Sequence, residues 1–263
     1  TAKSAIELAN GKNGIPSGSF AASDYVGQSV GSAGDVDGDG VPDVVLSASH
    51  NDDGATDAGG AWVILLNTNG TAKSAIELAN DKNGFPAGSL YLNGKAFSGF
   101  TVVGDVNGDR LPDMVFGHAS MNSAYVVMFQ SGMCDGRSPC ASLLDGQNVV
   151  AGRLGFERAP GRRVRSAIEL ANGKNGIPSG SFAASDYVGR RVASAGDVDG
   201  DGVPDLVLGA YANDDGGSNA GGAWVILLNA DGTAKSAVEL ANGKNGVTLH
   251  EILRIKGLFF SGC

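Results

Sequence analysis

The chain has 263 residues, of which 42 are glycine, only 10 are phenylalanine and 2 are tryptophan, and its formal net charge is -9. This composition favours short strands joined by tight turns and disfavours a helix-rich fold. Because much of the acidity is concentrated in repeated loops, it points to bound cations, and we expect no nucleic acid partner. No apolar run of about 18 residues or more is present, so the sequence predicts no membrane span.

One sequence block recurs along the chain and sets its organisation. Its opening words "KSAIELAN" begin at Lys3 and return from Lys73, as "RSAIELAN" from Arg165 and as "KSAVELAN" from Lys235. Such self-similarity is typical of architectures in which each unit packs on its neighbours. We therefore predict a single domain over residues 1–263, with units at roughly 3–72, 73–164 with an insertion at 130–164, 165–234, and a partial unit at 235–263.

Each unit predicts four strands in chain order. In the first unit they lie near "YVGQSVGSAG", "PDVVLSA", "AWVILLN" and the next "KSAIEL". The Asn-Gly pair of "NTNGT", between the last two, is a strong hairpin signal because both turn residues tolerate positive φ. The helix propensity of "KSAIELAN" leaves a helix as the alternative there, but the "GKNG" turn that follows favours a strand.

Four-stranded antiparallel units repeated radially are the blades of a β-propeller. The predicted fold class is therefore all-β, with about three blades that are open or completed by oligomerisation, since closed propellers have four to eight. The outer-strand sequence occurs at both ends, in residues 1–14 and 233–246, which is one copy more than three blades need. An unpaired edge invites another chain, so we expect a head-to-tail homopolymer through strand or blade exchange. The alternative is a chain cut from a longer array.

Three acidic loops carry the chemistry of the repeat. The stretch "DVDGDGVPD" (35–43) returns as "DVNGDRLPD" (105–113) and again as "DVDGDGVPD" (197–205). Carboxylates at the first, third, fifth and ninth positions of a tight turn, with a carbonyl at the seventh, suit a hard cation such as Ca²⁺. An EF-hand would need a glutamate at the twelfth position, where Leu46 stands. The alternative is an ordinary Asp-Gly turn without metal.

The second loop departs from the pattern at two positions. Arg110 replaces the sixth-position glycine, where a positive φ is expected and costs a residue other than glycine on the order of 1 kcal/mol. Asn107 removes one charge. We expect calcium to bind this loop more weakly than the other two.

The loops and the strands around them resemble a known family. "VGQSVGSAGDVDGDGVPDVVLSA" and "YVGRRVASAGDVDGDGVPDLVLGA" are similar to the FG-GAP repeat of integrin α-subunit propellers, apart from Val26-Gly27 and Val188-Gly189 in place of Phe-Gly. The resemblance implies a calcium-binding propeller of extracellular type. By this resemblance the ligands of the first and third loops are Asp35, Asp37, Asp39 and Asp43 with the carbonyl of Val41, and Asp197, Asp199, Asp201 and Asp205 with the carbonyl of Val203. The equivalent positions of the second loop are Asp105, Asn107, Asp109, Leu111 and Asp113.

Two further features fit an extracellular or cell-surface chain. Cys134 and Cys140 enclose the turn "DGRSP" and are placed to form a disulfide, which an oxidising compartment would preserve. Asn69 opens the sequon "NGT" on a predicted hairpin turn, so we list it as a glycosylation site; an ordinary turn is the alternative, as the equivalent Asp231 has no sequon.

The sequence contains no recognisable catalytic motif, and the three histidines fall at unrelated places in the repeat. We therefore expect no enzyme, but a calcium-stabilised extracellular module that serves as a structural or adhesive building block and assembles into a filament. The alternatives are a piece of a larger integrin-like propeller that supports a receptor or enzyme domain, and a lectin-like module. Under either alternative we expect the chain to bind an extracellular protein or a glycan.

Overall fold

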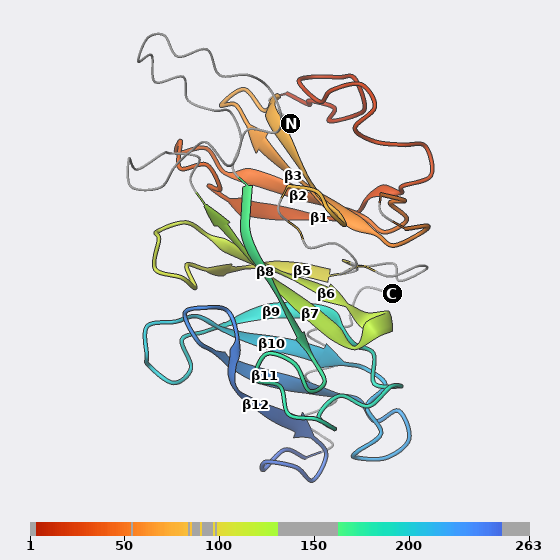
Figure 1. Ribbon diagram of the computed structural model, residues 1–263, viewed down its shortest axis with the longest axis vertical. Coiled ribbons are helices and arrows are strands. Elements are labelled where there is room, and N and C mark those ends of the chain that lie inside the picture. Colours follow the sequence, from red (N-terminus) through yellow and green to blue (C-terminus); the bar gives the residue numbers. More distant parts are fainter. Residues whose placement is uncertain are drawn as a thin grey trace.

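The computed structural model describes residues 4–53, 55–83, 85, 90, 97, 99–130 and 163–248. It contains three four-stranded antiparallel sheets, each with its strands in chain order, and they follow one another along the long axis of the molecule (Figure 1). The sheets do not close into a ring. The prediction of an all-β fold with three propeller-like blades is confirmed.

The twelve strands have the following bounds. Sheet 1 contains β1 (Val26–Gly34), β2 (Asp43–Ala48), β3 (Gly60–Leu66) and β4 (Ala72–Leu78). Sheet 2 contains β5 (Gly99–Gly104), β6 (Asp113–His118), β7 (Ser123–Gln130) and β8 (Arg163–Ala171), and sheet 3 contains β9 (Val188–Gly196), β10 (Asp205–Ala210), β11 (Gly222–Leu228) and β12 (Ala234–Ala241). The one helix of the described residues is the single 3-10 turn η1 (Ala119–Met121).

The recurring "SAIEL" segment forms the outer strand of each sheet, as β4, β8 and β12. The strand interpretation of this segment is therefore confirmed for three of its four copies. The first copy differs, because Ser4–Ala9 lies in no sheet of the described part of the chain. The surplus copy of the outer-strand sequence is thus not a strand in the described part of the chain.

Apolar side chains between successive sheets form the core. Val36, Val63 and Phe116 belong to a buried cluster between sheets 1 and 2. A second cluster between sheets 2 and 3 includes Val106 and Leu208. Sheet 2 thus packs on sheet 1 through one face, its leading face, and on sheet 3 through the other, its trailing face, and the equivalent faces of sheets 1 and 3 take the same names.

Both tryptophans are core residues. Trp62 and Trp224 are 6% and 5% exposed, and each packs edge-on against a phenylalanine of the preceding loop, Phe20 or Phe182, with ring centroids 5.4 and 5.3 Å apart. Tyr125 takes the equivalent place in sheet 2. Among the described residues, no helix is long and apolar enough to cross a membrane.

Candidate metal centre

The acidic loops connect the first two strands of each sheet, and each ends where the second strand begins. Asp43, Asp113 and Asp205 are the first residues of β2, β6 and β10, and all three are buried. Most of the preceding loop residues are aspartate, asparagine or glycine, which are common turn formers, so the chain turns sharply within a few residues. The strand pair therefore fixes the ninth-position carboxylate, and the other carboxylates stand on the turn above it.

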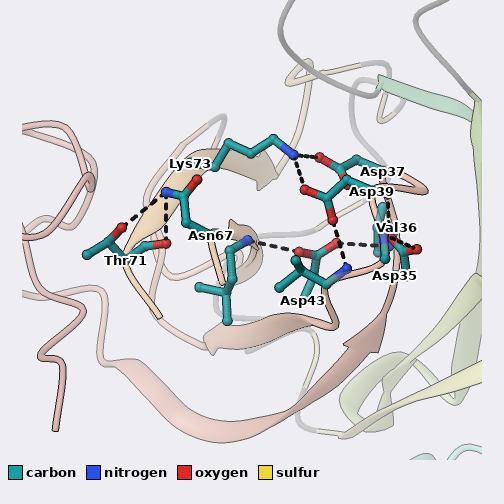
Figure 2. A network of polar contacts seen from close by, with 11 residues as sticks. Asp35, Val36, Asp37, Asp39, Asp43, Asn67, Thr71 and Lys73 are labelled. Carbon is teal, nitrogen blue, oxygen red and sulfur yellow. Dashed lines mark hydrogen bonds and ion pairs between the residues drawn. The ribbon is translucent and has the colours of Figure 1, made fainter. Parts of the chain in front are cut away.

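The ninth-position aspartate ties the loop to the third strand. One carboxylate oxygen of Asp43 accepts a hydrogen bond from the Val36 N–H (2.8 Å), and the other accepts from the Leu66 N–H (2.9 Å) (Figure 2). Asp113 and Asp205 make the same two contacts at equivalent residues. This aspartate is a structural support as well as a candidate ligand.

The first-position aspartate holds the turn from the inside. The carboxylate oxygens of Asp35 accept hydrogen bonds from the N–H groups of Asp39 (3.0 Å) and Gly40 (2.9 Å). An oxygen of Asp39 accepts in turn from the Val41 N–H at 2.8 Å. The third loop repeats these contacts from Asp197 and Asp201. The turn therefore presents its carboxylates in a fixed arrangement.

Three carboxylates converge in the first loop and again in the third. Ligand atoms of Asp35, Asp37 and Asp43 lie within 4.8 Å of one another, and those of Asp197, Asp199 and Asp205 do the same. Two predicted ligands, Asp39 and Asp201, are not members of these clusters and instead contact a lysine. Carboxylate oxygens in this number and proximity are a donor set that fits Ca²⁺.

A lysine that the sequence analysis did not single out lies over each cluster. Lys73, in the outer strand β4, donates to Asp37 and also to Asp39 at 2.5 Å (Figure 2). Lys235 of β12 makes the equivalent contacts to Asp199 and Asp201, at 2.5 and 2.8 Å. The carboxylates raise the pKa of both lysines, and the ammonium of Lys73 lowers the pKa of Asp39. The loops thus have an environment that favours positive charge.

Burial and like charge act together on the ninth-position carboxylates of the first two loops. Desolvation raises the pKa of Asp43, with smaller contributions from the charges of Asp37 and Asp35. In the second loop, desolvation raises the pKa of Asp113 to about 7. A bound cation would relieve this repulsion and favour the ionised form.

The second loop keeps the backbone of the other two. Asp105 accepts from the N–H groups of Asp109 and Arg110, at 2.9 and 2.7 Å, and Arg110 has the expected positive φ of 70°. Asn107 takes the place of the third-position aspartate, and its amide nitrogen is buried without a hydrogen-bond partner among the described residues. Leu111, at the seventh position, donates to Asp109. The loop shape is retained, but one carboxylate is missing.

The acidic stretch "NDD" at 51–53, repeated at 213–215, also builds a polar cluster. Asn51 is 2% exposed and donates to the Glu77 carboxylate at 3.0 Å, and Asn213 and Glu239 repeat this contact in sheet 3. Burial raises the pKa of Glu77 to about 7, and neighbouring Asp53 adds to the effect. The recurrence of "NDDG" ahead of a strand glutamate is the signal that could have indicated this pairing.

Glu77→Gln should change how stability depends on pH. The folded-state pKa of Glu77 is raised above the unfolded value. Its contribution to the free energy of unfolding is therefore fully present below about pH 4.5 and is lost as the pH rises through about 7. Glutamine keeps the acceptor for Asn51 without ionising. We expect the variant to match the parent at about pH 4 and to exceed it by on the order of 1–2 kcal/mol at about pH 8, after allowance for solvent screening. Urea unfolding at both pH values checks this; an equal offset at both would contradict it.

Two other predicted sites stand as follows. Cys134 and Cys140 lie outside the described residues. Asn69 is exposed on the β3–β4 turn, where its side-chain oxygen accepts from the N–H and hydroxyl of Thr71, at 3.0 and 2.7 Å. Asp231 makes the same contacts with Thr233. The turn geometry therefore accounts for this residue without a glycan, and glycosylation stays a prediction.

Comparison with known families agrees with the loop geometry. The FG-GAP repeat family model matches residues 26–64 and 188–226, the ranges that hold the first and third acidic loops. The chain therefore contains two FG-GAP repeats, and the resemblance expected from the sequence is confirmed. A search of curated proteins finds no match.

Proposed function

We propose that this FG-GAP repeat chain is a non-catalytic, calcium-stabilised structural or adhesive module of the integrin-like propeller type. FG-GAP repeats form propeller domains of adhesion type that are not enzymes. The observation that carries the proposal is the convergence of Asp35, Asp37 and Asp43, which the third loop repeats. The chemistry of the donor set supports calcium, because hard oxygen ligands suit a hard cation of variable coordination number.

Two aspartates of the loop are already held in position to bind an ion. Asp43 is fixed by two backbone hydrogen bonds, and Asp35 by two more, so both carboxylates are oriented before an ion arrives. A bound calcium ion supplies positive charge that offsets the repulsion among the carboxylates. Since Asp43 also contacts β3, order in the loop is transmitted to the sheet. Ion binding would therefore stabilise the folded chain as a whole.

An extracellular or cell-surface location belongs to the proposal. FG-GAP repeats are typical of proteins at these places. Structural calcium is also best suited to an environment where the ion is abundant, because sites in extracellular modules bind it with dissociation constants of roughly 10⁻⁴–10⁻³ M. The Asn69 sequon, exposed on its turn, agrees with such a location.

Head-to-tail assembly into a filament is the second part of the proposal. Ser4–Ala9 carries the outer-strand sequence of β4 and β12 but pairs with no strand of the described residues. A segment with strand sequence and no neighbouring strand among the described residues is suited to join a sheet of another copy. A structural building block of this kind needs no catalytic site.

Direct ion counting tests the calcium proposal. Equilibrium dialysis of the whole, metal-stripped chain against calcium should find at least two bound ions, one for each carboxylate cluster. Asp35→Asn should lose one ion, and the Asp35→Asn/Asp197→Asn double variant should lose both. Asp57→Asn, which changes an aspartate outside the loops, should bind as the parent does. Calcium binding equal in the parent and the double variant would refute the assignment.

A further inference from the structure

Each contact between sheets contains the same close fit between a proline and a glycine. A Cβ added to Gly34 of sheet 1 would lie 3.2 Å from Pro112 of sheet 2, and one added to Gly104 of sheet 2 would lie 3.1 Å from Pro204 of sheet 3. The glycine ends the first strand on the trailing side, and the proline precedes the second strand of the following sheet. The absence of a side chain at the glycine gives the proline ring its space.

At the two ends of the described array this pair is incomplete. Gly196 of sheet 3, the equivalent of Gly34 and Gly104, has nothing within 4 Å of an added Cβ. Pro42 of sheet 1, the equivalent of Pro112 and Pro204, is exposed, whereas those two are partly buried. The glycine position of sheet 3 is therefore open for want of a proline, and the exposed proline of sheet 1 has no glycine to pack against.

The apolar residues around this fit show the same pattern. On the trailing face, Val36 and Val106 are 0% and 1% exposed, but the equivalent Val198 of sheet 3 is 57% exposed. On the leading face, Val192 of sheet 3 is 9% exposed, but the equivalent Val30 of sheet 1 is 66% exposed. The residues exposed at the two ends are thus the equivalents of residues that the contacts between sheets bury.

The leading face of sheet 1 is also hollowed. A hollow of about 530 Å³ is lined by residues that include Phe20, Val26, Val30 and Leu46. In sheet 3 the equivalent Phe182, Val188 and Leu208 are buried at 0–3% exposure, and all three pack in the cluster with sheet 2. The difference is that sheet 2 covers the leading face of sheet 3, whereas no sheet of the described residues covers the leading face of sheet 1.

We infer that these end faces bind each other, so that the trailing face of sheet 3 in one copy docks on the leading face of sheet 1 in a second copy. The inference rests on the proposed head-to-tail assembly and specifies its joint. The occupant is a second copy of this chain, because the two faces complement each other. Gly196 and Val198 are exposed on the trailing face of sheet 3, and Pro42 and Val30 are exposed on the leading face of sheet 1. Docking would place Pro42 against Gly196 and would cover Val30 and Val198.

The unpaired segment already occupies part of this joint. Asn13 accepts a hydrogen bond from the Ala72 N–H at 2.7 Å, as Asn175 accepts from the Ala234 N–H at 2.8 Å. Ile6 lies against Gly70 as Ile168 lies against Gly232. Residues 6–14 therefore occupy the same place relative to sheet 1 that the end of β8 and the turn after it occupy relative to sheet 3.

A docked copy would bring its own β12 to the place that this segment fills. Both cannot lie there, so docking requires exchange, with Ser4–Ala9 pairing to β11 of the other copy in place of β12. The two sequences, "SAIELA" (4–9) and "SAVELA" (236–241), differ only by Ile6 for Val238. Both of these side chains are exposed, at 40% and 38%. The exchange therefore replaces one strand with a nearly identical one.

Two charged substitutions test the joint in the full chain with calcium present. Val30→Asp and Val198→Asp change exposed side chains, so each variant should fold, which circular dichroism checks. Sedimentation velocity should show the parent as a species of two or more copies, whether a closed pair or a longer series, and each variant as a monomer. Met121→Asp, at a residue 41% exposed outside both faces, should assemble as the parent does.

Mixing the two variants separates this joint from other contacts. The Val30→Asp chain keeps an intact sheet 3 face, and the Val198→Asp chain keeps an intact sheet 1 face. An equal mixture should therefore form pairs of one copy of each and nothing larger. Variants that assemble as the parent does, or a parent that stays monomeric at high concentration, would overturn the inference. The calcium proposal is independent of these outcomes, because ion counting on the same chains tests it.

Discussion

Replacing Asp113 with alanine should lower the free energy of unfolding by about 3 kcal/mol or more, one of the largest effects of any single change in the chain. Asp113 is fully buried, and its two carboxylate oxygens accept from the N–H groups of Val106 (2.9 Å) and Phe129 (3.2 Å). Alanine would leave both backbone donors buried without a partner. Urea unfolding in the presence of EDTA measures the loss without a contribution from bound ions.

Glu7→Ala is the control for this experiment. The Glu7 side chain is 64% exposed and forms an exposed ion pair with Lys12 at 2.7 Å. Such a pair contributes less than about 1 kcal/mol, so the control should unfold close to the parent. If Asp113→Ala were as mild as Glu7→Ala, the ninth-position aspartate would not be the support that the hydrogen bonds imply.

Gly117→Ala should also be strongly destabilising, by about 3 kcal/mol, because the added methyl group would force sheets 2 and 3 apart. A Cβ at this position would lie 1.7 Å from the carbonyl oxygen of Gly189 and 3.1 Å from Val192. The carbonyl belongs to the backbone of β9, so it cannot move aside without shifting the strand. Thermal unfolding of the variant should show a clearly lower midpoint.

Gly180→Ala distinguishes this steric effect from a general cost of replacing glycine. Gly180 has a φ of +88° and nothing within 4 Å of an added Cβ, so alanine there meets backbone strain alone. We expect a loss of about 1 kcal/mol. Equal losses in the two variants would argue against close packing of β6 on β9.

The repeat made most of the fold predictable from the sequence. Short apolar runs such as "AWVILLN" and the Asn-Gly turn at Asn69 indicated the strands of one unit, and recurrence of the block extended them to the others. The strand choice for "KSAIEL" depended on the turn that follows it, because propensity alone also allows a helix. Its first copy shows the limit of local sequence, since Ser4–Ala9 has the same residues as a strand but no neighbouring strand to pair with.

The candidate site was predictable in its ligands but not in its surroundings. Alternating aspartates with glycine between them indicate a cage, because the spacing acts within one short turn. The position of Lys73 over the first loop depends on the register of β4 against β3 and on the shape of the sheet, which no short motif encodes. The same holds for the burial of Asn51 against Glu77, which are 26 residues apart in sequence.

Thermal unfolding in excess calcium and in EDTA tests the central claim of a calcium-stabilised fold most directly. A ligand that binds only the folded state stabilises it by about 4 kcal/mol when its concentration is 1,000 times the dissociation constant. We expect a midpoint several degrees higher in calcium for the parent chain, and no such difference for the Asp35→Asn/Asp197→Asn variant. An identical midpoint for the parent in calcium and in EDTA would contradict it.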